Sequence, residues 1–353
     1  MGTMRKMPVD HAALRLLPNV DPEVVRASAV EYVADRSGVP ADDLGALDIV
    51  AELTDEIVST RDAEWCRQLV LEAVIGWPDE TADVAMEMLR SQGWRRRVAA
   101  AELMNDLCNY RPERNLEFAQ AIIEAIDSET DPNVLSFLVV ALSCAAELEG
   151  FVAPEPVYDT DDPSYRPFWS PISPEDQGLM DRHEIWTLLA DERLDRVVEL
   201  IATAAVSSRR RLAIALRAFD PSNRRIRSAL LGLTADAAEE VRDWATFAVI
   251  QAYPSLDGDD VRAALWARVA DTDWEVRDEA IAALAIRKAG GAFELLERGL
   301  REEPSDYLLG AAADLADPAL LPALMAITKD RDCTWFRQAV EACGGRTAET
   351  AAG

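Results

Sequence analysis

Along much of the chain, apolar residues recur at spacings of three and four, the spacing that gathers side chains on one face of a helix. The clearest stretch covers residues 273–284, and its apolar face is formed by Val276, Ala280, Ala283 and Leu284. Asp273 stands where a helix-capping residue is expected. Strand-like alternation of apolar and polar residues is not sustained over any comparable length. The pattern therefore predicts an all-α chain.

The same helical frame is repeated along the sequence. Val241-Arg242 precedes Val276-Arg277 by 35 residues, and small or apolar residues follow both pairs at the same offsets. Further frames begin near Cys66, Arg95, Val134, Ser208, Tyr307 and Phe336. Amphipathic segments lie between the frames, so each unit is predicted to be a helix pair. A single helix pair cannot bury its apolar face, but successive pairs that stack on one another bury these faces in a continuous core. We therefore predict a right-handed α-solenoid of stacked antiparallel helix pairs.

The frame Asp-x-x-Val-Arg-x-x-Ala-x-x-Ala-Leu at 273–284 resembles HEAT repeats. Its short spacing is similar to the HEAT-like repeats of phycobilin lyase subunits. The resemblance covers about residues 50–345 and implies a fold rather than an activity. It also implies a ladder of ion pairs between arginines and acidic residues of neighbouring repeats, with Arg67, Arg242, Arg277 and Arg337 in this structural role.

A segment rich in proline and aromatic residues interrupts the repeats, with six of the 18 prolines in residues 154–174. Proline excludes a regular helix, and the aromatic residues indicate a segment that packs on the solenoid or forms part of a binding surface. The predicted organisation is an N-terminal tail with capping helices at 1–49, HEAT-like repeats at 50–149, the insertion at 150–178, HEAT-like repeats at 179–345, and a disordered tail at 346–353.

The charge of the chain limits its partners. Acidic residues number 64 against 36 basic residues, which gives a formal net charge of −28. Such a chain repels the phosphates of nucleic acids and attracts basic proteins. We expect the partner to be a basic protein or peptide, with nucleic acid disfavoured. No apolar run approaches the length of a membrane span, about 18 residues, so we expect a cytoplasmic protein without a membrane partner.

Residues for catalysis or metal binding are sparse. The only histidines are His11 and His183, and the five cysteines contain no Cys-x-x-Cys motif. Most of the carboxylate clusters, such as 257–260, precede helices, where capping is the expected role. We therefore expect no catalytic residues, no metal ligands and no cofactor.

Aromatic residues and arginines are the candidate contacts for a partner. Trp244 and Phe247 lie off the core face of their helix, and Trp274 precedes the next frame. Exposed aromatic residues can anchor a partner, although packing between repeats explains them equally well. The triplets 95–97 and 209–211 each place one arginine on the ladder, and the others could pair with carboxylates or bind an anionic group. The candidate partner-binding residues are Trp244, Phe247, Trp274, Arg96, Arg97, Arg210, Arg211, Tyr165, Phe168 and Trp169.

Three functions are compatible with these features. The first is a non-enzymatic scaffold or adaptor whose acidic concave surface binds a protein, one version being an inhibitor or immunity-type protein that binds a basic protein. The second is an enzyme similar to HEAT-like DNA glycosylases, for which Asp243, Trp244 and Trp274 supply the residue types but the net charge is unfavourable. The third is a lyase or chaperone subunit for the maturation of another protein.

Overall fold

The computed structural model describes residues 22–147, 191–217, 219, 223–251, 257–327 and 333–345. Within these ranges the chain is helical and forms no β-strand, which confirms the predicted all-α class. The chain divides into two compact units: one comprises Met1–Glu155 and Gly178–Ala204, the other Pro156–Gln177 and Ala205–Gly353. The predicted insertion at 150–178 and tail at 346–353 lie outside the described residues.

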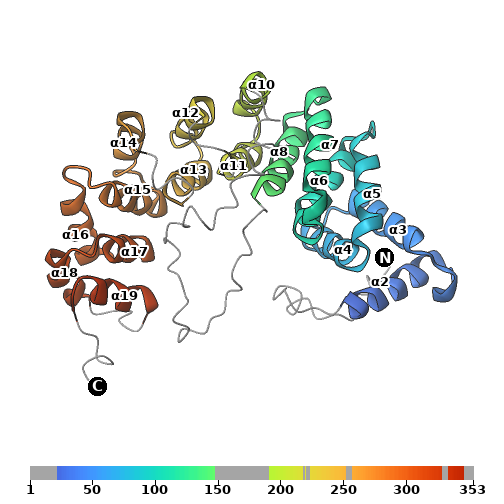
Figure 1. Ribbon diagram of the computed structural model, residues 1–353, viewed down its shortest axis with the longest axis horizontal. Coiled ribbons are helices and arrows are strands. Elements are labelled where there is room, and N and C mark those ends of the chain that lie inside the picture. Colours follow the sequence, from blue (N-terminus) through green and yellow to red (C-terminus); the bar gives the residue numbers. More distant parts are fainter. Residues whose placement is uncertain are drawn as a thin grey trace. The chain divides into compact units, whose positions relative to one another are not determined.

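Stacked helix pairs build the first unit. In chain order its elements are α2 (Pro22–Ser37), η1 (Ala41–Asp43), α3 (Ala46–Ser59), α4 (Ala63–Gly76), α5 (Pro78–Leu89), α6 (Trp94–Tyr110), η2 (Pro112–Arg114), α7 (Asn115–Ser128), α8 (Pro132–Glu147) and α10 (Asp191–Ala202). One layer stacks α2, α4, α6 and α8 in succession, and α3, α5 and α7 form the second layer (Figure 1). Helix α10 packs on α8.

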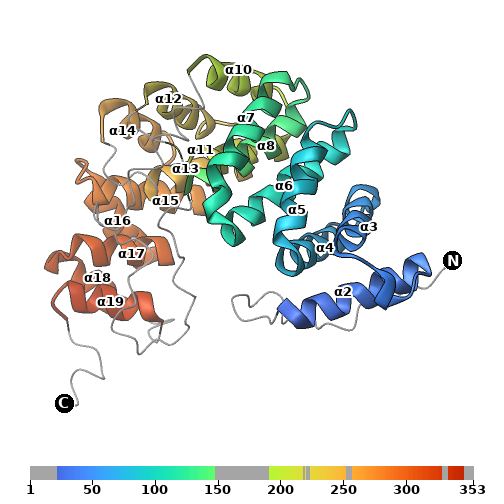
Figure 2. The ribbon, with the colours of Figure 1, turned by 45° about the vertical axis from the view of Figure 1, so that its right-hand side comes forward.

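The second unit has the same plan. Its elements are α11 (Val206–Leu216), α12 (Arg224–Leu233), α13 (Glu239–Gln251), α14 (Asp259–Trp266), α15 (Trp274–Ile286), α16 (Ala292–Glu302), α17 (Asp306–Leu315), η3 (Pro318–Leu320), α18 (Leu321–Ala326) and α19 (Thr334–Ala342). Helices α11, α13, α15, α17 and α19 stack in succession, and we call them the α13 layer. The helices α12, α14, α16 and α18 lie on the other side, as can be followed in Figure 2. Each unit is an α-solenoid.

Side-chain caps define where several helices begin. Asp273 accepts a hydrogen bond from the backbone N–H of Val276, 3.1 Å away, as the sequence predicts. Asp131 and Asp317, which each precede a proline, accept hydrogen bonds from the N–H two residues later, on Asn133 and Ala319. At α17 the cap is Ser305, which bonds the N–H of Leu308, so the buried frame begins at Leu308. The sequence prediction, which began this frame at Tyr307, was one residue early.

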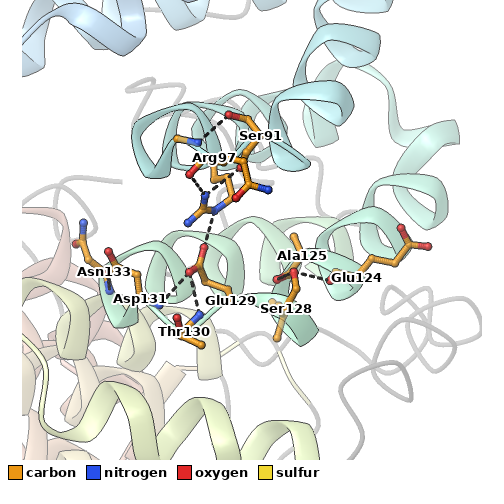
Figure 3. A network of polar contacts seen from close by, with 12 residues as sticks. Ser91, Arg97, Glu124, Ala125, Ser128, Glu129, Thr130, Asp131 and Asn133 are labelled. Carbon is orange, nitrogen blue, oxygen red and sulfur yellow. Dashed lines mark hydrogen bonds and ion pairs between the residues drawn. The ribbon is translucent and has the colours of Figure 1, made fainter.

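Arginines link successive repeats within each unit. In the first unit, the Arg97 Nε lies 2.6 Å from a Glu129 carboxylate oxygen, and Arg97 Nη1 donates to the carbonyls of Ser91 and Gln92 (Figure 3). The second oxygen of Glu129 accepts from the backbone N–H groups of Thr130 and Asp131. One carboxylate therefore holds the start of α8 and the arginine of the preceding repeat together.

Similar pairs between an arginine and a carboxylate of the next repeat occur in the second unit and at one further place in the first. Arg242 binds Asp271 through two hydrogen bonds of 2.7 and 2.8 Å and also donates to two carbonyls in the turn before α13. Arg209 binds Asp236 with bonds of 2.7 and 3.0 Å. In the first unit, Arg67 pairs with Asp106 at 2.8 Å. These contacts agree with the structural role implied for Arg67 and Arg242, and with a ladder position in each triplet.

In the described part of the chain, no helix is long and apolar enough to cross a membrane. The five cysteines are free thiols, and two of them, Cys108 and Cys343, are buried. Cys333 has a different role, since its sulfur caps α19 by accepting a hydrogen bond from the N–H of Phe336.

Candidate functional site

An open cavity of about 690 Å³ lies in the second unit, lined by α15, α17, α19 and the turn that precedes α17. Its aromatic lining consists of Trp274, Tyr307 and Trp335. Its polar and charged lining consists of Glu275, Arg277, Asp278, Glu303, Ser305 and Asp306. The volume is in the range of small-ligand pockets, about 300–1,000 Å³. We call this site the aromatic-acidic cavity.

The repeat itself positions the cavity walls. Each of the three helices begins after a side chain that accepts a hydrogen bond from the N–H three residues later, and these caps are Asp273, Ser305 and Cys333. The third residue after each cap is buried in the core. The second residue after each cap lines the cavity, namely Glu275, Tyr307 and Trp335. Stacked repeats place equivalent positions side by side, so the row follows from the repeat.

Negative charge predominates in the cavity. Its single arginine, Arg277, pairs with Asp278 at 2.9 Å and with Glu303 at 3.6 Å. Among the described residues, the carboxylates of Glu275 and Asp306 form no ion pair and no hydrogen bond. Two acceptors therefore remain available to a ligand.

Further acidic groups are buried next to this cavity. Glu279 on α15 is fully buried, and neither of its carboxylate oxygens has a hydrogen-bond partner of normal geometry in the described chain. Burial, together with the charge of Asp243 on α13, raises the pKa of Glu279 well above its usual value, and the nearby hydroxyl of Tyr307 partly opposes this shift. Burial also raises the pKa of Asp243 to about 6, with contributions from Glu275 and Asp273. Burial therefore favours the protonated form of Glu279.

The aromatic candidates from the sequence fall at two places in the α13 layer. Trp244 and Phe247 on α13 are half-buried and pack edge to face, with ring centroids 5.7 Å apart. Trp274 is 50% exposed and forms part of the cavity wall. Packing accounts for much of the first pair, whereas Trp274 presents a large apolar surface to solvent.

Most arginines of the two triplets are engaged in ion pairs. Arg97 pairs with Glu129, and Arg96 pairs with Asp55 on α3 at 2.6 Å. Arg210 pairs with Glu240 at 3.3 Å. Arg211 is half-buried on α11. One triplet lies in each unit, and neither contributes a residue to the cavity lining.

The remaining candidates are not part of the described structure. Tyr165, Phe168, Trp169 and the two histidines lie outside the described residues. Within the described ranges, no group of three or more His, Cys, Asp or Glu side chains is arranged to hold a metal ion.

Sequence reasoning did not identify Glu275, Glu279, Tyr307 or Trp335 as site residues. One signal for Glu279 was present, because it stands 35 residues after Trp244 and so occupies the same position of the repeat. A second signal was the shared position of Glu275, Tyr307 and Trp335, each of which stands two residues after a helix cap. This shared position becomes visible only when Ser305 and Cys333 are known to be caps, and the sequence prediction did not place those two caps.

The stacked helix pairs are those of a helical-repeat α-solenoid. No protein-family model matches the chain. Protein YibA of Escherichia coli, strains K12 and O157:H7, is 36% identical over 97 residues, which are 27% of this chain and 34% of YibA. The match thus spans about a third of the length of these curated relatives.

The comparison with solved structures includes one chain that shares the fold. The X-ray structure of Escherichia coli YibA superposes with a TM-score of 0.57 and 15% identity, covering 93% of this chain and 98% of that chain. A crystal structure of importin beta gives a TM-score of 0.44 and 14% identity, covering 94% of this chain and 45% of that chain. At such identities the similarity to YibA shows a shared fold and leaves activity and partners open.

Proposed function

We propose that this chain is a non-enzymatic protein-binding scaffold that binds a basic protein through the acidic α13 layer of its second unit. The single observation that carries the proposal is the aromatic-acidic cavity, in which two carboxylates without ion pairs stand beside three aromatic side chains. Aromatic anchors supply much of the energy in protein interfaces, and complementary charge speeds association. The free cysteines and the net charge of −28 are compatible with a cytoplasmic binding protein.

Charge on α13, α15 and α17, the three middle helices of the α13 layer, supports the same proposal. Besides the buried Asp278 and Glu279, helices α13, α15 and α17 carry exposed or half-buried acidic residues at Glu239, Glu240, Asp243, Glu275, Asp306 and Asp314. The same three helices carry basic residues only at Arg242 and Arg277, and both are paired with carboxylates. Such a surface attracts a basic partner over a distance of about one Debye length, roughly 8–10 Å at physiological salt.

The alternative functions have less support. A DNA glycosylase needs a basic groove, whereas Arg96, Arg97, Arg209 and Arg210 are already paired with carboxylates. A role in the maturation of a client protein, implied by the resemblance to phycobilin lyase subunits, would be one version of protein binding. Inhibition of a basic protein would be another, and the identity of the captured protein separates the two.

The proposal is tested by affinity capture with the tagged full chain from a lysate of the source cells. Proteins are eluted at about 0.1 M and about 0.5 M salt and identified by mass spectrometry. We expect a specific basic protein that is released at the higher salt concentration. A triple variant with Glu239, Glu240 and Asp314 changed to lysine is expected to capture much less of it.

A matched variant controls for the change in total charge. Asp259, Glu294 and Glu302 are exposed acidic residues on α14 and α16, outside the α13 layer. Changing these three to lysine alters the net charge equally and should leave capture nearly intact. Equal losses in both variants, retention of nucleic acid, or capture of no basic protein would contradict the proposed function.

A further inference from the structure

The aromatic-acidic cavity has the chemistry of a binding site for one cationic side chain. Three rings, from Trp274, Tyr307 and Trp335, come from three successive helices of the α13 layer. Aromatic faces attract cations within about 6 Å of the ring centroid. A cation placed among these rings would also lie in a cavity that Glu275 and Asp306 line with carboxylates.

We propose that this cavity binds the guanidinium group of an arginine in the basic partner, an inference that rests on the proposed function. Arginine fits the lining better than lysine does, since its planar group stacks on aromatic rings while its N–H groups donate to carboxylates. Lysine, a strongly hydrated point charge, can satisfy only one of these demands well. The four carboxylates of the lining, against a single arginine, disfavour an anionic ligand.

An arginine of the chain itself shows how the cavity accommodates this group. The guanidinium of Arg277 is held by Asp278 and Glu303, and its side chain is about one-third exposed at the cavity wall. Arg277 therefore pairs with both of these carboxylates and leaves a net charge of −1 among the three groups. The carboxylates of Glu275 and Asp306 form no comparable pair, so they can receive a second guanidinium.

Glu279 supplies an independent observation behind the cavity wall. Its buried carboxylate oxygens lack a hydrogen-bond partner of normal geometry among the described residues, and the group that interacts with them is the hydroxyl of Tyr307, which lines the cavity. Buried polar atoms without partners carry a free-energy cost and are rare in folded proteins. A cation bound against Tyr307 would favour the ionised form of Glu279, because a nearby positive charge lowers the pKa of a carboxyl group.

The inference is tested with the full chain and three fluorescently labelled hexapeptides, made of arginine, lysine or citrulline. Citrulline keeps the shape of arginine and lacks its charge. Fluorescence anisotropy is expected to show binding of hexa-arginine about tenfold tighter than of hexa-lysine, and no binding of hexa-citrulline. The substitutions Glu275→Gln, Asp306→Asn and Trp335→Leu are each expected to weaken hexa-arginine binding about tenfold.

Two controls lie on the opposite layer. Glu294→Gln on α16 makes the same charge change at an exposed position, and Trp266→Leu on α14 removes a partly exposed tryptophan. Both should bind hexa-arginine as the unaltered chain does. If Trp335→Leu disturbs folding, as judged by circular dichroism, the shape-conserving Glu275→Gln and Asp306→Asn decide the question.

The outcomes separate the two proposals. If the cavity variants and the controls bind hexa-arginine equally, or if hexa-arginine and hexa-lysine bind alike, the arginine site is wrong. Salt-sensitive capture of a basic protein by the same variants would then leave the proposed function standing. If neither hexa-arginine nor any basic protein binds, both proposals fail.

Discussion

Replacing Arg242 by methionine is expected to lower the free energy of unfolding by about 3 kcal/mol, because it leaves the carboxylate of Asp271 buried without its main partner. The two side chains are only 11% and 4% exposed, and two hydrogen bonds join them. Burial alone would raise the pKa of Asp271, but Arg242 and the N–H of Asp273 outweigh burial and hold that pKa below its usual value. The ion pair of Asp271 with Arg268, at 3.1 Å, limits the loss.

Urea denaturation followed by circular dichroism measures this loss. The control is Arg301→Met, which removes the exposed pair between Arg301 and Glu297 on one helix. Such pairs contribute only about 0.5 kcal/mol or less, so this variant should unfold almost as the unaltered chain does. Equal midpoints for the two variants would show that the ladder does not stabilise this repeat.

The second large effect is on the pH dependence of stability in the first unit. Glu72 on α4 is 1% exposed; burial raises its pKa to about 7, and a hydrogen bond from Gln68 opposes the shift. The folded chain therefore keeps this proton over a pH range in which an unfolded glutamate has lost it. The stability contributed by Glu72 is fully present below about pH 4.5 and is lost as the pH rises through about 7.

Glu72→Gln is expected to remove this dependence. The variant should gain stability relative to the unaltered chain as the pH rises from about 4.5 to about 8, by up to about 3 kcal/mol, since one pKa unit corresponds to about 1.4 kcal/mol. Urea denaturation at several pH values measures the difference. Glu31→Gln, at an exposed position on α2, should give a difference that does not vary with pH. A constant difference for Glu72→Gln would contradict the prediction.

The fold was predictable because its signals are local. Val241-Arg242 and Val276-Arg277 repeat both the core position and the ladder position, and aspartates before the helices mark several starts. The prediction began the frame at Tyr307, one residue early, because an aromatic residue can begin a buried helix face as readily as a leucine can. The hydrogen bond from Leu308 to Ser305 settles the register, and it depends on three-dimensional geometry.

The cavity was harder to predict than the fold. Trp274 was identified from its position beside a frame, and it does line the cavity. Glu275, Tyr307 and Trp335 share no residue type, so only their equivalent positions after three different caps relate them. Glu279 resembles any polar residue of a helix, and its burial depends on the packing of α15 between α13 and α17. Such packing between residues far apart in the chain cannot be inferred from the residue pattern of a single sequence.

Helix α19 contributes Trp335 to the cavity and, among the described elements, packs against α17 and α18. A ligand that contacts Trp335 on α19, Tyr307 on α17 and Glu275 on α15 binds only while these three helices are packed together. Occupancy of the cavity is therefore coupled to the packing of α19 on α17. A ligand there should slow amide hydrogen exchange in residues 334–342 more than in α13, and trimming of α19 would reduce affinity while leaving the acidic wall of α15 in place.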